Sequence, residues 1–173
     1  MEPSAQNLMA TVSQEAIQEL EDALGKIKHC LGQLDDEQIW WRPIPTMNSI
    51  ANLVLHLCGN VRQWIVSGVG GVEDKRNRPQ EFSERGPIGS DELLGRLEAT
   101  ITEAKEAIAR ASAKDLLATR RIQGFDVTGF GAIFHSVSHF RGHTQEIVHM
   151  TRFQLGEHYQ FDFVPTTPEQ GAS

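Results

Sequence analysis

The sequence predicts an all-α fold, a four-helix bundle with a long crossover loop between its second and third helices. Four long stretches carry apolar residues at helical spacing, and strand-like alternation is scarce. In addition, a long glycine-rich and charged segment separates the second stretch from the third. The 173 residues suit one domain, which we expect over residues 1–163, followed by a flexible tail over residues 164–173.

The first helix is expected over residues 11–34. Thr11 and Gln14 have the spacing of a capping box at its start. Its apolar stripe consists of Val12, Ala16, Leu20, Leu24, Ile27, Leu31 and Leu34. A short segment follows and is ended by Pro43, because proline cannot continue a helix.

The second helix is expected to begin after Asn48 or Ser49, both good N-caps, and to reach about Val66. Its apolar stripe consists of Ile50, Leu53, Val54, Leu57, Val61, Trp64 and Ile65. Residues 67–89 are then rich in glycine and charge. A loop of this length inside a compact domain is usually a binding loop, a crossover or disordered.

The third helix is expected to start at a Ser90 cap and to carry its apolar stripe as far as Ala111. A segment of mixed character follows. Thr128 is expected to open the fourth helix, which reaches Leu155, and Gly156 suits the position after its end.

Composition and charge limit the function. The net charge of −7 argues against nucleic acid as a partner, since phosphate binding needs a concentrated basic surface. Neither a membrane-spanning apolar run nor a secretory signal is recognisable. Cys30 and Cys58 fall on different predicted helices, which favours two free thiols in a reducing cytoplasm over a disulfide. We therefore expect a cytoplasmic protein.

The most informative residues are the histidines. His135, His139 and His143 follow one another at four-residue spacing, so they span about 80° of a helix and border its apolar face. His56 lies beside the apolar stripe of the second helix. A histidine pair from one helix and a single histidine from another would give one metal ion three ligands and leave positions open, as in reactive sites. The alternative is an exposed polar edge that binds no metal.

Two known kinds of metal site do not match. A zinc protease needs glutamate directly after the first histidine of the pair, whereas Phe140 follows His139. A di-iron bundle needs carboxylates paired with histidines on several helices. Glu146 lies three residues after His143, but the second and third helices show no matching Glu-x-x-His. One ion is the simpler interpretation.

Two motifs resemble the DinB-like (YfiT-type) family of helical bundles, and the resemblance extends from about Asp35 to Leu155. They are N-S-I-A-N-L-V-L-H-L-C-G-N in the second helix and H-F-R-G-H-T-Q-E-I in the fourth. The resemblance implies that His56, His139 and His143 hold one divalent ion, namely nickel, zinc or iron. It implies no ligand role for His135, which would be a neighbouring or surface residue. A homodimer is a further expectation from the family.

Other residues of the predicted site have alternative interpretations. Arg76 and Arg78, in a segment that resembles a loop of a subgroup without an assigned reaction, could each bind a substrate carboxylate with two hydrogen bonds, or be solvated. Asn60 could bind substrate within the site or tie helices together. The chain has Glu146 where many family members have glutamine. Glu146 could orient a metal ligand or act as a catalytic base.

Family members with assigned roles transfer low-molecular-weight thiols or isomerise with their help, and others are described as metal-dependent hydrolases. The resemblance therefore implies a metal-dependent enzyme that acts on a small molecule, with thiol transfer ahead of hydrolysis. The alternative, from another class, is a metal-stabilised bundle that binds a ligand or protein partner without catalysis.

Overall fold

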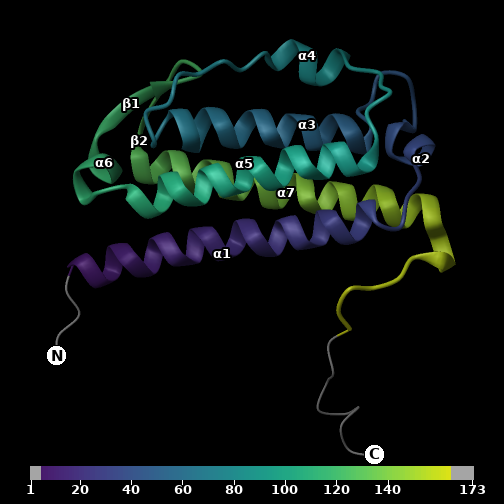
Figure 1. Cartoon of the computed structure of the whole chain (residues 1–173), viewed down its shortest axis with the longest axis horizontal. Helices are drawn as coiled ribbons and strands as arrows, with labels where there is room; N and C mark the ends of the chain where they lie inside the picture. The colour runs from purple at the N-terminus through teal and green to yellow at the C-terminus, as the bar shows by residue number, and fades with distance from the viewer. Residues whose placement is uncertain (1–4, 165–173) are drawn as a thin grey trace, which may run out of the picture.

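The computed structural model describes residues 5–164 and confirms the all-α four-helix bundle (Figure 1). The four long helices are α1 (Ala5–Leu31), α3 (Ile50–Val61), α5 (Ser90–Arg110) and α7 (Gly129–Leu155). Helices α1 and α3 each pack against both α5 and α7, so the four apolar stripes meet in one core. The shorter helical elements are α2 (Asp36–Trp40), η1 (Arg62–Ser67), α4 (Arg78–Ser83), α6 (Ala113–Leu117) and η2 (Gly156–His158).

Two predicted helix starts are wrong. Helix α1 begins before Thr11, whose hydroxyl instead donates a hydrogen bond to the carbonyl of Asn7 inside the helix (2.9 Å). The N-cap of α5 is Gly89 rather than Ser90, and it offers no side-chain hydrogen bond. The carboxylate of Asp36 in α2 accepts a hydrogen bond from the backbone N–H of Ser90 (2.9 Å). A residue distant in the sequence thus satisfies a free N–H group in the first turn of α5, as a local N-cap side chain would.

Helix α1 ends at Leu31, three residues before the predicted Leu34, and a turn follows it. The remaining helix ends agree with the sequence to within about one residue. Ser49 caps α3 and forms a capping box with Asn52. The helical path continues to about the predicted end, although its last turn, η1, is a π-helix. Thr128 accepts a hydrogen bond at the start of α7, and Gly156 follows its end with a φ of 54°.

The segment of mixed character before α7 is a β-hairpin. Strands β1 (Thr119–Ile122) and β2 (Phe125–Thr128) pair antiparallel around Gln123 and Gly124, both with positive φ. This is the backbone of a primed two-residue turn. Ile122 and Val127 of the hairpin pack against Trp64 of η1, forming a small second cluster beside the main core.

Residues 67–89 form a crossover that carries α4 across α3 (Figure 1). Asn52, fully buried in α3, holds it in place. Its Nδ2 donates to the carbonyls of Glu81 (2.9 Å) and Glu84 (3.1 Å), while its Oδ1 accepts from Arg42. These bonds give hydrogen-bond partners to two backbone carbonyls of the crossover.

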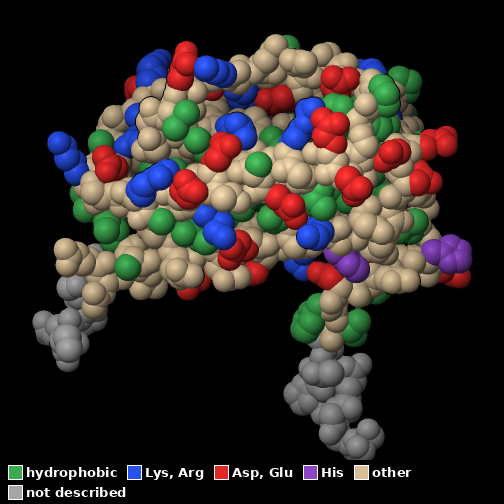
Figure 2. Space-filling model, viewed as in Figure 1, with side chains coloured by type: hydrophobic (Ala, Val, Ile, Leu, Met, Phe, Trp, Pro, Cys, Tyr) green, Lys and Arg blue, Asp and Glu red, His purple; other side chains and the backbone are tan. Residues whose placement is uncertain are grey.

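Acidic and basic side chains are interspersed over the face formed by α1, α5 and the crossover (Figure 2). Ion pairs Lys28–Glu98 and Lys105–Glu21 join α1 to α5 there. Within residues 5–164, no helix has both the length and the apolar character needed to cross a bilayer. The predicted flexible tail lies outside the described residues except for Val164.

Replacement of Asn52 by alanine should destabilise the protein by about 2–4 kcal/mol, because it leaves the buried backbone carbonyl of Glu81 without its donor and removes an acceptor from the guanidinium of Arg42. The free energy of unfolding measured by urea denaturation tests this. Asn77→Ala, at an exposed position of the same crossover, is the matched control and should cost less than about 0.5 kcal/mol. Equal losses for the two variants would contradict the anchoring role of Asn52.

Candidate metal centre

Three histidines from two helices meet between α3 and α7. His56 lies in α3, and His139 and His143 lie one turn apart on α7. One ring nitrogen of each lies within 4.8 Å of those of the other two, and Nε2 of His56 is 2.9 Å from Nε2 of His139. Nitrogens that bind one ion at about 2.1 Å are themselves about 3–4 Å apart. The three side chains could therefore hold one metal ion.

Two of these histidines have a carboxylate oxygen beside Nδ1. Nδ1 of His56 lies 2.9 Å from Oε2 of Glu81, and Nδ1 of His143 lies 2.7 Å from Oε2 of Glu146. A proton on Nδ1, donated to the carboxylate, leaves the Nε2 lone pair free. This arrangement is typical of histidines that bind metals.

His139 is half-buried, and its ring centroid lies 5.0 Å from that of His56 and 4.5 Å from that of His143. Burial, followed by electrostatic repulsion from His143 and His56, lowers the pKa of His139 to about 4. The ring is therefore uncharged at neutral pH. Since a metal binds only neutral imidazole, the donor set fits a divalent ion.

Glu81 comes from α4 and is buried, as is the Arg76 side chain that accompanies it. Arg76 donates from Nε to Oε1 (2.7 Å) and from Nη2 to Oε2 (2.8 Å) of Glu81. Burial opposes ionisation of the carboxyl group, but the hydrogen bonds and charges of Arg76 and His56 outweigh it, so the pKa of Glu81 falls below its usual value. The crossover thus brings an ionised carboxylate to His56.

Aromatic rings surround the histidines. The ring of Phe82 lies over His56, with centroids 4.8 Å apart, and the guanidinium of Arg78 lies 5.0 Å from the centroid of Phe82. On the other side, His135 stacks on Trp64 at 3.9 Å and parallels His139 at 5.9 Å. His135 therefore lies beside the group of three and outside it.

The remaining predicted site residues have different surroundings. The guanidinium of Arg76 donates hydrogen bonds to Glu81 and Gln63, whereas Arg78 is exposed. Asn60 is buried and accepts a hydrogen bond from Ser136 Oγ (2.9 Å), which links α3 to α7. Their roles in substrate binding stay predictions.

Sequence reasoning gave no role to Glu81, Phe82 or Trp64. Glu81 and Phe82 lie in the crossover, where no periodicity relates a residue to a particular helix face. Trp64 was placed in the apolar stripe of its helix, and its contact with His135 depends on how η1 meets α7. The only available signal for Glu81 was its place in the R-N-R-P-Q-E-F segment.

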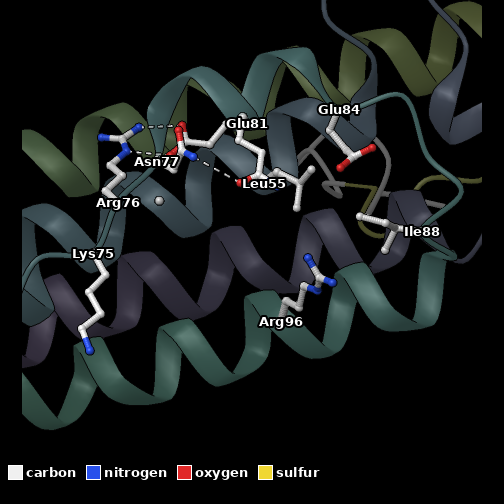
Figure 3. A pocket seen from close by; sticks show the side chains of 10 residues that line it. Leu55, Lys75, Arg76, Asn77, Glu81, Glu84, Ile88 and Arg96 are labelled. Carbon is white, nitrogen blue, oxygen red and sulfur yellow. Dashed lines mark hydrogen bonds and ion pairs between the residues drawn. The ribbon is translucent and has the colours of Figure 1, made fainter.

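A pocket of about 300 Å³ lies beside the Arg76–Glu81 pair, between the crossover and helices α3 and α5 (Figure 3). Lys75 and Arg96 line it together with Leu55 and Glu84, and the three histidines do not. Arg76 and Glu81 border both this pocket and the histidine group.

Solved structures with the same fold support this architecture. A conserved protein of Enterococcus faecalis has a TM-score of 0.70 and 16% identity, over 83% of this chain and 97% of its own. A DinB-like protein of Bacillus cereus has a TM-score of 0.65 and 13% identity, over 82% of this chain and 91% of its own.

No curated protein matches the sequence. The family described as "Protein of unknown function (DUF1572)" matches residues 7–167, which is nearly the whole chain. Together with the bundle topology and its DinB-like neighbour, this match decides the family. The chain belongs to DUF1572, a family of DinB-like helical bundle proteins.

Proposed function

We propose that the protein binds one divalent metal ion, nickel, zinc or iron, through His56, His139 and His143 and acts with it on a small molecule. The observation that carries the proposal is the convergence of three ring nitrogens within 4.8 Å, from three histidines of which two have a carboxylate oxygen beside Nδ1. Three protein ligands leave coordination positions for a reactant.

A bound ion would lower the pKa of a thiol or water and so supply a nucleophile near neutral pH. Glu146 is suited to take the proton that is released. Its side chain is 43% exposed, and within residues 5–164 its one side-chain contact of hydrogen-bond length joins Oε2 to Nδ1 of His143. The second carboxylate oxygen therefore stays available to a substrate.

The substrate proposed is a small molecule that reacts with a low-molecular-weight thiol, and hydrolysis is the second choice. The resemblance to thiol transferases of the DinB-like family supports this order. The exposed guanidinium of Arg78, held over Phe82 next to His56, is placed to attract an anionic group such as a carboxylate. Arg76 is better suited to hold Glu81 than to contact substrate, because its donors are engaged.

The other expectations from the sequence stay predictions. They are the homodimer, the cytoplasmic location and the absence of a nucleic-acid partner. The non-catalytic alternative, a metal-stabilised bundle that binds a ligand, is tested by the experiments below.

Protein purified without an affinity tag should contain about one divalent ion per chain when measured by elemental analysis. His56→Ala and His143→Ala should lose most of it, because each removes one of three ligands. His135→Ala is the matched control and should keep the ion, since His135 stacks on Trp64 outside the group. Full metal occupancy in His56→Ala would remove that residue from the ligand set.

Glu146→Gln should keep the ion yet slow turnover by about 10²–10⁴-fold, the range for loss of a general base. The measurement is a screen of low-molecular-weight thiols against electrophilic small molecules, alongside simple esters and amides. Metal-loaded wild type that melts at a higher temperature than chelator-treated protein, but turns over none of these, would favour the non-catalytic bundle.

A further inference from the structure

We infer that Glu81 is a positioning residue that fixes the tautomer and ring orientation of His56 in the metal centre. Glu81 is itself held by hydrogen bonds from Arg76 and packs against Gly59. The inference deepens the proposed function and rests on it for its consequence, metal affinity. Through Glu81 the crossover becomes a part of the site, although none of the three histidines lies in that segment.

The tautomer follows from the distance between two acceptors. Oε2 of Glu81 and Nδ1 of His56 are 2.9 Å apart. An ionised carboxylate has lone pairs only, so an unprotonated Nδ1 at that distance would place two lone pairs against each other. A proton on Nδ1 removes the conflict and leaves Nε2 unprotonated, facing His139. The Nη2 of Arg76 is 3.2 Å from the same Nδ1 but only 2.8 Å from Oε2, so its proton belongs to the carboxylate.

The carboxylate itself has little freedom. Its two oxygens accept three hydrogen bonds, two from Arg76 and one from His56, and the side chain is 9% exposed. Arg76 is fixed in turn, because its Nη1 donates to Gln63 (2.9 Å) and its backbone N–H donates to Asp74 (3.0 Å). His56 therefore meets an acceptor whose position is determined by several other groups.

Gly59 permits this approach. A Cβ at that position would lie 1.9 Å from Oε1 of Glu81 and 2.9 Å from Nε of Arg76. Any other residue would push the ion pair away from α3 and hence away from His56, one turn earlier on the same helix. Glycine is otherwise unfavourable inside a helix, so the close contact explains its presence.

Glutamine cannot replace Glu81 in this arrangement. Both carboxylate oxygens accept from Arg76, so the amide nitrogen of glutamine would face an Arg76 donor in either orientation. Glu81→Gln thus keeps the shape of the side chain but disturbs the contacts that orient His56. Glu103→Gln is the matched control, since Glu103 also pairs with an arginine, Arg62, but lies on α5, which carries none of the three histidines.

The first test uses nitrogen-15 NMR of the imidazoles in metal-free protein, at a pH well above about 6.5, where an ordinary imidazole is neutral. Wild type and Glu103→Gln should show His56 with its proton on Nδ1, and Glu81→Gln should show a loss of that preference. His56 protonated on Nε2 in wild type, or an unchanged tautomer in Glu81→Gln, would overturn the inference. This readout needs no metal, so it stands even if the proposed metal function fails.

The second test compares Gly59→Ala with Gly95→Ala, a helical position where a Cβ meets no atom within 4 Å. Chelator competition should show a metal affinity about 10–100-fold weaker for Gly59→Ala and unchanged for Gly95→Ala, the range expected when a partner of a metal-binding histidine is lost. Circular dichroism establishes that each variant is folded. A folded Gly59→Ala with wild-type metal affinity would overturn the inference even where Glu81→Gln fails to fold.

Discussion

The buried charge of Glu81 is the constraint on which the candidate site depends. An ionised carboxylate inside a protein is tolerated only when its charge is paired and its lone pairs are used. Arg76 supplies the opposite charge and two hydrogen bonds, and His56 supplies a third. Removal of one partner from a buried pair typically costs about 3–5 kcal/mol, since the other charge is left without compensation. The conformations of the crossover and of the His56 ring are therefore coupled.

This coupling explains how a loop segment becomes well defined on a helical bundle. The crossover contributes little to the main core, so apolar packing alone would hold it weakly. Polar groups on α3 hold it instead: Asn52 binds its backbone carbonyls, and His56, one turn later, binds the carboxylate of Glu81. Both side chains are buried and lie on the same face of α3. That face is thus specialised for binding the crossover, and the site residue His56 is part of it.

The sequence predicted those features that depend on local periodicity. Apolar stripes identified the four long helices, and four-residue spacing identified His139 and His143 as neighbours. The position of His56 beside the apolar stripe of its helix made it a candidate partner, but the choice of His56, His139 and His143 without His135 came from the resemblance, because no local pattern connects residues so far apart. The Thr11 and Ser90 caps were wrong since capping patterns are short and recur by chance, and Asp36 reaches α5 only through the tertiary fold. Glu81 escaped notice for the same reason: its proximity to His56 is created by the path of the crossover.

The two carboxylates of the site have different environments, and these support different proposed roles. Glu81 is buried, carries three hydrogen bonds and has a lowered pKa, so it stays ionised and cannot exchange a proton with a reactant. Glu146 meets Nδ1 of His143 through one oxygen, and its side chain is open to solvent, so a reactant can reach its carboxylate. Enzymes commonly divide acid–base and orienting tasks between carboxylates in this way, through environment rather than residue type. The same comparison argues against exchanging the roles: a base needs a carboxylate oxygen free to take a proton, and both oxygens of Glu81 already accept hydrogen bonds from Arg76 and His56.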